Sequence, residues 1–355
     1  MPPPQFNHRW VSDTNAYNKP MPRICIVPRV DGLAGVASFR LKFESGLRSR
    51  GVDITHNTSE SSDAILVLAG TRHLLPLWRA RSRGQRIVQR LDGINWVHRV
   101  RWAGLRYTIR AIYGNWNLSF IRARLADEVI YQSQFINRWW DDWYLPARVP
   151  SSVIINGVDL DQYTPDGLHE RPSMHYRILI VEGSMVGGLN SGLFSAVELA
   201  NQLSQKYKIE LNIVGKVDAH TKNNIKDQPA FRINFMDTVK REHIPWLMRS
   251  SHLLFSAEVN PPCPNSVIEA LACGLPVIGF DTGSLSELVQ GNAGRLATYG
   301  ANQWKLQHPN IQALADAAEE VLQENDNFRK SARELAEENL GLEKMVDKYL
   351  KVLLK

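Results

Sequence analysis

Short apolar runs alternate with longer amphipathic stretches along most of the chain. In the first half the apolar runs lie at 23–30, 64–70, 86–91, 127–133 and 151–159. The second half repeats the rhythm, with runs at 177–183, 210–215, 232–237, 251–257 and 275–281. Most of these runs precede a helical stretch, which predicts parallel strands covered by helices. We therefore expect an α/β chain with two doubly wound, Rossmann-like domains facing a central cleft.

The domain boundaries follow from changes in composition along the 355 residues. Residues 1–22 are polar, rich in Pro and Asn, and lack the apolar core of a signal peptide, so we expect a loose arm there. A polar segment broken by Gly and Pro at 166–176 predicts the seam between domains at 23–170 and 171–337. A closing helix is expected within 338–355, packing on its own domain or crossing back to the first. Its apolar face combines Met345, Val346, Tyr349, Leu350, Leu353 and Leu354.

Composition excludes several classes of protein. Hydrophobic residues make up 44% and charged residues 22%, which is ordinary for a soluble enzyme and unlike a disordered or collagen-like chain. No apolar run approaches the roughly 18 residues that would span a bilayer. Three cysteines, Cys25, Cys263 and Cys273, lack metal-ligand spacing. They predict free buried thiols and a cytoplasmic protein.

Positive charge is concentrated in an arginine-rich segment, residues 71–124. This segment contains 12 Arg, no Lys and a single carboxylate, Asp92, whereas the whole chain has a net charge of +6. Four Trp are interleaved with these arginines: Trp78, Trp96, Trp102 and Trp116. An anionic membrane surface or a phosphorylated acceptor fits this pattern, and a solvated basic face is the alternative. We expect no nucleic acid partner, because no helix-turn-helix, RNP or zinc pattern accompanies the charge.

The sharpest chemical motif lies at 256–289. Its PPCPN sequence excludes a helix up to about residue 265, and Ser266 with Glu269 has the S-x-x-E spacing of a capping box. The backbone amides of Asn265, Ser266 and Val267 would then point into the cleft as an anion site. From this local pattern, Glu269 either accepts the hydroxyls of a ribose or serves only as a cap.

The segment PNSVIEALACGLPVIGFDTGSLSELV resembles the donor-site signature of the family-4 retaining glycosyltransferases, which have the GT-B fold. Further resemblances follow in the family's order, at 31–54, 126–135, 153–165, 238–258 and 338–353. Together they span about residues 23–354. The resemblance implies an acceptor domain at 23–170 and a nucleotide-sugar donor domain at 171–337.

The family's donor residues can be transferred position by position. The second glutamate of the family's E-x7-E motif binds the donor ribose and corresponds to Glu269, but Pro261 stands where the first glutamate contacts the sugar. Glu258 could replace that carboxylate only if the loop bends back. Gly32 and Gly35 match the family's first glycine loop, whose amides touch the diphosphate. More of the sugar and phosphate recognition would then rest on the backbone of Cys263, Pro264, Asn265, Ser266 and Val267.

A second departure concerns the diphosphate. The family usually has an Arg and a Lys in the loop after the first strand of the second domain, whereas residues 182–192 contain no cation. A departing diphosphate requires preorganised donors. The amides of Gly187 and Gly188 are candidates, and so are three cations: Lys216, Lys240 and Arg241.

A third departure concerns the first domain. The family often has His–Gly after the fourth strand, where this chain has Asp92 before Gly93. We expect Asp92 to orient the acceptor or a sugar hydroxyl as the catalytic carboxylate, or else to pair with Arg90. The acceptor is expected to meet Arg90, Trp96, Arg99 and Arg101.

The resemblance implies a retaining transfer of a hexose from a nucleotide sugar, with a UDP-glucose-like donor favoured. The acceptor would be a saccharide or lipid-linked saccharide, in polysaccharide or glycolipid synthesis, with no cofactor and no metal. The location would be the cytoplasm, with peripheral association at the inner face of the membrane as an option. Two alternatives stay open: a degraded GT-B domain that binds nucleotide sugar or polysaccharide, and a nucleotide-sugar epimerase.

Overall fold

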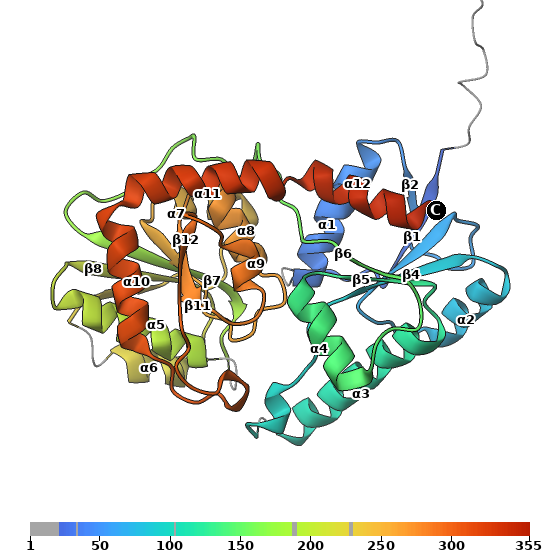
Figure 1. The fold of residues 1–355 in the computed structure, drawn as a ribbon, viewed down its shortest axis with the longest axis horizontal. Helices are drawn as coiled ribbons and strands as arrows, with labels where there is room; N and C mark the ends of the chain where they lie inside the picture. The colour runs from blue at the N-terminus through green and yellow to red at the C-terminus, as the bar shows by residue number, and fades with distance from the viewer. Residues whose placement is uncertain (1–20, 33–34, 103, 187–189, 227–229) are drawn as a thin grey trace, which may run out of the picture.

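The structure is a computed structural model that describes residues 21–32, 35–102, 104–186, 190–226 and 230–355. Except for Met21 and Pro22, the expected arm lies outside the described residues. Two lobes lie side by side, each built around a twisted sheet with helices on both faces (Figure 1). The expected α/β architecture is thereby confirmed.

The first domain has a six-stranded parallel sheet in the order β2-β1-β3-β4-β5-β6. Its strands are β1 (Arg23–Val27), β2 (Asp53–Thr55), β3 (Ala64–Leu68), β4 (Arg86–Leu91), β5 (Glu128–Tyr131) and β6 (Ser151–Val153). Its helices are α1 (Gly35–Arg48), α2 (Leu74–Ser82), α3 (Leu105–Arg124) and α4 (Gln134–Tyr144), with a short 3₁₀ helix, η2 (Val97–Arg99). The central strand β3 is buried at every position, as expected of a parallel sheet covered on both faces.

The second domain has a six-stranded parallel sheet in the order β12-β11-β10-β7-β8-β9. The strands are β7 (Tyr176–Ser184), β8 (Ile209–Lys216), β9 (Arg232–Phe235), β10 (Leu253–Phe255), β11 (Val277–Phe280) and β12 (Gly294–Ala297). The helices are α5 (Ser191–Ser204), α6 (Ala219–Lys226), α7 (Ile244–Arg249), α8 (Asn265–Ala272), α9 (Leu285–Leu288), α10 (Ile311–Gln323) and α11 (Asn325–Asn339). Two 3₁₀ helices are η4 (Arg241–His243) and η5 (Gln303–Lys305). In both sheets the strand ends that precede helices face the partner domain.

The chain crosses between the domains twice, and the two crossings pair with each other. Val158 donates its N–H to the carbonyl of Leu340 and accepts the N–H of Leu342, both at 2.8 Å. Gly157 permits this approach, because a Cβ there would lie 2.8 Å from the Cα of Leu342. The first crossing comes before the polar segment at 166–176, since Val158 and Tyr163 are already buried in the second domain.

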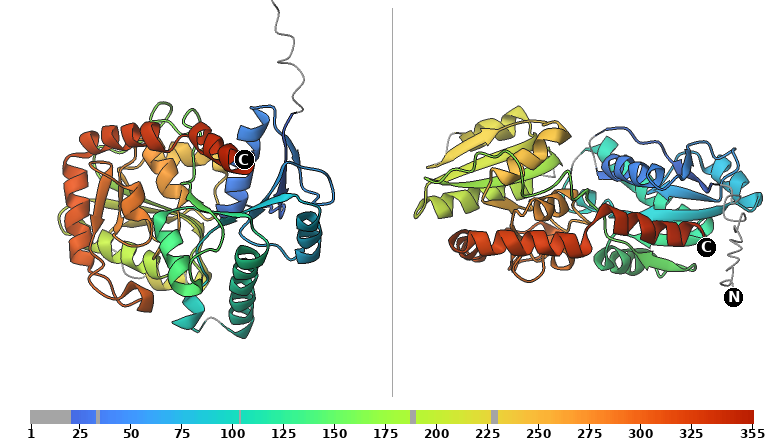
Figure 2. Two further views of the ribbon diagram at one scale, coloured as in Figure 1. Left: turned by 45° about the vertical axis from the view of Figure 1, so that its right-hand side comes forward. Right: turned by 90° about the horizontal axis from the view of Figure 1, so that it is seen from above.

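The last helix, α12 (Leu342–Leu353), packs against α1 of the first domain (Figures 1 and 2). Its buried side chains join the first-domain core beside Ile24, Phe39 and Phe43. The Tyr349 ring centroid lies 5.0 Å from that of Phe43 and 5.4 Å from that of Phe39. Of the two placements that the sequence left open, the structure has the one on the first domain.

The domains also contact each other beside the cleft. The two carboxylate oxygens of Glu287, in α9, accept the backbone N–H groups of Gln134 and Phe135, each at 2.7 Å. These amides open α4, where a negative charge is favourable because the helix dipole is positive at its N-terminus. Trp304, in η5, inserts its ring among the aromatic side chains of the first domain. These contacts hold the two cleft walls in one arrangement.

Candidate functional site

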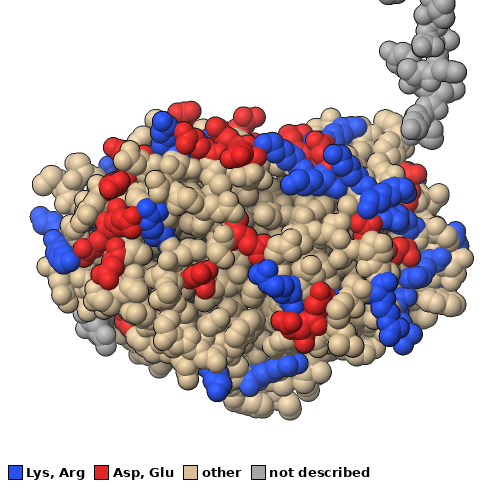
Figure 3. Space-filling view, viewed as in Figure 1, with Lys and Arg blue, Asp and Glu red and all other residues tan. Residues whose placement is uncertain are grey.

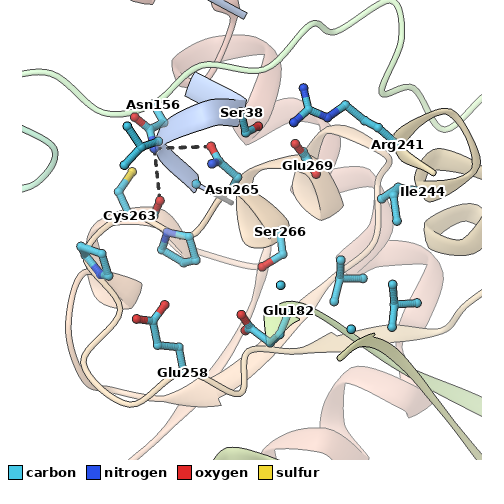
Figure 4. A pocket seen from close by; sticks show the side chains of 18 of the residues that line it. Ser38, Asn156, Glu182, Arg241, Ile244, Glu258, Cys263, Asn265, Ser266 and Glu269 are labelled. Carbon is cyan, nitrogen blue, oxygen red and sulfur yellow. Dashed lines mark hydrogen bonds between the residues drawn. The ribbon is translucent and has the colours of Figure 1, made fainter. Parts of the chain in front are cut away.

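A cavity of about 490 Å³ lies between the two domains, at the carboxyl ends of both sheets. Ligands of doubly wound folds bind at this edge of the sheet. The first domain contributes Gly35, Val36, Ser38, Arg90, Asp92, Gln132 and Asn156. The second contributes residues from the ends of β7, β8 and β9, from the Pro-rich loop and from α8 (Figure 4).

The start of α1 in the first domain faces the start of α8 across the cleft. Gly32 adopts a positive φ of 124°, a conformation that side chains rarely allow, and Gly35 opens α1. A Cβ added at Gly35 would lie 4.0 Å from Nδ2 of Asn265. The predicted meeting of Gly35 and Ser266 at one cleft is therefore confirmed, because both residues line it.

The start of α8 differs from the expected capping box. The helix begins at Asn265 with Pro264 as its N-cap residue, and no side chain caps it. The prediction that Ser266 caps this helix was wrong, because the extended Pro264 occupies the N-cap position and Ser266 lies in the first turn. Ser266 points into the cleft (Figure 4). Amides in the first turn of a helix lack intrahelical acceptors, so they are available to a ligand.

The loop residues before α8 are fixed by the first domain. Asn156 donates from Nδ2 to the carbonyl of Cys263 at 3.2 Å and to Oδ1 of Asn265 at 3.4 Å. Ser133 donates from its hydroxyl to the carbonyl of Pro262 at 2.8 Å. Cys263 and Pro264 line the cleft, whereas the Val267 side chain is fully buried in the second-domain core. The cysteine side chains do not titrate near neutrality, since burial raises the pKa of each thiol to about 12.

Glu269 lies in the cleft and makes an ion pair that spans the two domains. Its Oε1 lies 2.6 Å from Nζ of Lys42, which comes from α1. Both side chains are about 90% buried, with exposed fractions of 10% and 9%. Because Glu269 also lines the cleft, the geometry is compatible with recognition of a ribose hydroxyl. Sequence reasoning missed Lys42, whose position in a basic helix gives no sign of a partner 227 residues away.

Asp92 lines the cleft and pairs with Arg90, which is one of the two alternatives foreseen for it; its role toward an acceptor stays a prediction. Arg90 is only 1% exposed, donates to Asp92 at 2.5 Å and to Oδ1 of Asn156 at 3.0 Å, and stacks on Phe39. Gln132 donates to the same Asp92 oxygen. Arg90 therefore holds Asp92 and Asn156 in place, and its guanidinium is already engaged.

The cations proposed for the diphosphate separate in the structure. Arg241 lines the cleft beside Glu269 (Figure 4). Lys216 and Lys240 do not line it, and the exposed Lys240 lies 3.9 Å from Glu242. Gly187 and Gly188 lie outside the described residues. Arg241 is thus the one of these cations that the structure brings to the cleft.

Two carboxyl groups, Glu182 and Glu258, line the floor of the cleft (Figure 4). Glu258 comes from the loop after β10 and points into the cleft although it precedes Pro261 by three residues. Glu182 was not foreseen, because it lies within a strand, β7, where the family's diphosphate loop is expected to begin. Enclosure by the protein raises the pKa of both carboxyls above their usual range, and Glu258 adds to the effect on Glu182.

We expect this pair to weaken folding as pH rises. A carboxyl with a raised folded-state pKa holds its proton in the folded chain and loses it in the unfolded chain above about pH 4.5, so the free energy of unfolding falls through that window. Relative to wild type, Glu182→Gln should be neutral at pH 4 and raise Tm at pH 8 by roughly 2–4 °C. Thermal denaturation across pH measures this difference.

The exposed Glu338 provides the control for that experiment. Glu338→Gln should leave the pH dependence of Tm unchanged. A Glu182→Gln profile parallel to that of wild type would contradict the raised pKa of Glu182.

The remaining acceptor candidates lie outside the main cleft. Trp96 and Arg99 line a neighbouring aromatic cavity. Arg101 lines a smaller cavity with the start of α5 and His308. The structure places these residues and Arg90 in different cavities, because η2 turns this stretch away from the end of β4; their contact with an acceptor stays a prediction. Among the described residues, no three His, Cys, Asp or Glu side chains are arranged to hold a metal ion.

Comparison with known proteins places this geometry in context. A family model described as glycosyl transferases group 1 matches residues 177–324. No curated protein sequence matches the chain. Sucrose-phosphate synthase from Thermosynechococcus elongatus has a similar structure, with a TM-score of 0.71, 16% identity and coverage of 94% of this chain and 98% of that chain.

Two further solved structures are similar over both domains. HepE from Anabaena in complex with UDP-glucose gives a TM-score of 0.66 at 15% identity, covering 93% of this chain and 99% of its own. WaaG, a glycosyltransferase involved in lipopolysaccharide biosynthesis, gives 0.66 at 13% identity with the same coverage. Residues 177–324 therefore match the model of the group 1 glycosyl transferases, on a chain whose two domains have the GT-B fold.

Proposed function

We propose that the protein is a retaining glycosyltransferase that moves a hexose from a nucleotide sugar to a hydroxyl of a saccharide acceptor. The observation that carries this proposal is the position of Glu269, which faces a cleft closed by the Gly35 loop and the start of α8. The complex of the similar HepE with UDP-glucose favours a UDP-linked hexose as the donor.

Different residues of the cleft bind different parts of the donor. Glu269 accepts the ribose hydroxyls while Lys42 holds its carboxylate in place. The diphosphate lies against the first-turn amides of α8 and α1, with Arg241 nearby, where positive potential is concentrated. Glu258 and Glu182 on the cleft floor bind hydroxyls of the sugar. They supply the carboxylate contact that the family's first glutamate makes, since Pro261 stands at that position here.

Transfer itself requires no side-chain nucleophile in this proposal. The departing diphosphate oxygen takes the proton of the acceptor hydroxyl, and the closed cleft holds the two reactants together. Asp92, fixed by Arg90, orients the acceptor hydroxyl from the first domain. No metal and no cofactor enters this scheme.

Release of UDP from UDP-glucose, with and without saccharide acceptors, tests the proposal. We expect UDP to raise the melting temperature by mass action and UDP-glucose to be turned over when an acceptor is present. A second candidate is a degraded GT-B domain, favoured by the absence of any cation between residues 182 and 192. A protein that binds UDP but never releases it from UDP-glucose would support that candidate.

We also propose that the acceptor is lipid-linked and met at an anionic membrane surface. Helix α3 exposes an apolar face at Leu105, Ile109, Ile112, Tyr113 and Trp116, and Trp102 before it is 74% exposed. Exposed arginines at 101, 106 and 110 flank this face. Apolar side chains flanked by arginines are typical of a helix lying in a membrane interface. Within the described residues, no helix is long and apolar enough to span a bilayer.

The surface charge of the first domain also fits an anionic partner. On the face in Figure 3, Lys and Arg gather over the first domain, at the right of the view, with acidic residues among them. An anionic surface would attract this side of the molecule, each cation near it contributing about 1 kcal/mol.

We expect the double variant Ile109→Ser with Ile112→Ser to lower binding to anionic vesicles about tenfold or more. Each buried aliphatic side chain contributes on the order of 1–2 kcal/mol, and 1.4 kcal/mol is a factor of ten. The measurement is co-sedimentation with vesicles of phosphatidylcholine alone and of phosphatidylcholine with phosphatidylglycerol.

Leu168 gives a matched control, because it is 87% exposed on the second domain. Leu168→Ser should bind the vesicles as wild type does. The proposed membrane binding would be contradicted if the α3 variant sedimented as wild type does, or if wild type bound both kinds of vesicle equally.

A further inference from the structure

A second cavity of about 450 Å³ lies beside the donor cleft and is walled mainly by aromatic rings. Its walls are Trp96, Phe135, Trp139, Trp143 and Trp304, with Val100 at the side. The rim carries Arg99, Arg138 and Asp142, all exposed. None of the donor residues described above belongs to it.

Trp304 shows that both domains build this cavity. Its ring lies at centroid distances of 4.9 Å from Trp139 and 5.2 Å from Trp96, in edge-to-face arrangements. Trp304 belongs to η5 of the second domain, whereas the other aromatic walls come from α4 of the first domain and from Trp96, the residue before η2. The cavity therefore exists in the relative domain arrangement that also forms the donor cleft.

Only a thin wall separates the two cavities. A Cβ added at Gly93 would lie 3.2 Å from the Trp139 ring on one side and 3.6 Å from Pro262 on the other. Trp139 lines the aromatic cavity and Pro262 lines the donor cleft. Asp92, next to Gly93, faces the cleft. A chain-like ligand that receives a sugar at Asp92 therefore has the aromatic cavity within its immediate surroundings.

The chemistry of the walls fits a sugar ring better than a peptide or a fatty chain. Flat, rigid aromatic faces provide apolar contact area for the C–H face of a pyranose, and polar groups confined to the rim can reach its hydroxyls. The Arg99 guanidinium stacks 4.1 Å from the Trp143 ring, which holds its donors at the rim. Within the described residues, neither Arg138 nor Asp142 forms an ion pair.

The rim has two guanidinium groups and one carboxylate, so its net charge favours an anionic ligand. Planar guanidinium groups bind carboxylates and phosphates through paired hydrogen bonds. We propose that the aromatic cavity binds a sugar unit of an acidic saccharide, adjacent to the unit that accepts the hexose. The position relative to the acceptor rests on the proposed function; the binding of an acidic saccharide does not.

Saturation-transfer difference NMR on the full chain tests this site with two defined probes. Hyaluronan tetrasaccharide carries carboxylates, and chitotetraose is a neutral tetrasaccharide that shares its N-acetylglucosamine units. We expect transfer to the hyaluronan probe, weaker transfer to chitotetraose, and no loss of the hyaluronan signal when UDP is added. Trp143→Ala should weaken hyaluronan binding about two- to tenfold, the range expected for one aromatic contact. Arg138→Gln should abolish the preference for the acidic probe.

Trp78→Ala is the matched control, because Trp78 is 57% exposed on α2, outside this cavity. It should bind both probes as wild type does. No transfer to hyaluronan in wild type, equal transfer to the two probes, or unchanged binding in both Trp143→Ala and Arg138→Gln would overturn the assignment. UDP binding, measured by thermal shift on the same samples, reports separately on the donor site, so its absence would count against the proposed function alone.

Discussion

Glu269→Ala should weaken UDP binding about 10- to 100-fold and also destabilise the fold. The binding loss corresponds to about 1.5–3 kcal/mol for charge-assisted hydrogen bonds left unmade. The stability loss arises because Lys42 would remain largely buried without its partner, and breaking a buried pair costs about 3–5 kcal/mol. Titration calorimetry with UDP and denaturant unfolding measure the two effects.

Lys42→Met distinguishes the two roles of Glu269. This variant removes the pairing cation and fills its space, but it keeps the carboxylate that we assign to the ribose. We expect Lys42→Met to retain more UDP affinity than Glu269→Ala, and the double variant to recover part of the stability lost in Glu269→Ala. Normal UDP affinity in a destabilised Glu269→Ala protein would reduce Glu269 to a structural residue.

Arg90→Met should lower the free energy of unfolding by about 3 kcal/mol. Removing one partner of a buried pair costs about 3–5 kcal/mol, and the lower end applies because the side chain of Asp92 is 22% exposed and can regain water. Asn156 also loses its donor, which loosens the loop at Cys263. Urea unfolding monitored by tryptophan fluorescence measures the change.

Arg106→Met is the control for that experiment, because Arg106 is an exposed arginine of the same arginine-rich segment. A surface substitution of this kind should change stability by less than about 0.5 kcal/mol. If Arg90→Met proves as stable as Arg106→Met, Arg90 is not the residue that holds Asp92 and Asn156 in place.

The alternation of apolar runs and helices predicted the fold because parallel strands buried on both faces must be apolar throughout. Residues 64–68 illustrate this, since β3 is buried at every position, and in β7 the same holds for Ile178, Leu179 and Ile180. The cleft was predictable for a related reason: in doubly wound sheets the strand ends that carry loops meet at one edge. Gly35 and Ser266 therefore appeared on facing walls.

Partners across the cleft were not predictable in the same way. Lys42 and Glu269 are far apart in sequence, and no local periodicity encodes their contact. In the sequence, Glu182 is indistinguishable from other residues of a strand. It lies near Glu258 because β7 and β10 are neighbours in the sheet. The first contact depends on how the two domains are docked, and the second depends on the strand order within one sheet; sequence spacing contains neither.

Composition alone also grouped residues that a turn of the backbone places in different cavities. A stretch of ten residues inside the arginine-rich segment contains Arg90, Trp96 and Arg99. The positive charge of this segment suggested that the three residues share one site. The turn into η2 separates them: the buried Arg90 lines the donor cleft, while Trp96 and Arg99 line the aromatic cavity. The same turn brings them to Trp304, whose sequence neighbourhood gives no sign of this contact.

The packing of α12 on α1 bears on how the protein is made. The first-domain core around Phe39 and Phe43 is closed by residues 342–353, which are translated long after β6 ends at Val153. At about 5–20 residues per second, that delay is roughly 10–40 s. Throughout this interval the nascent first domain presents an uncovered apolar surface, whereas the second domain can complete its own sheet first. We therefore expect the core of the second domain to close before that of the first, the reverse of the usual order.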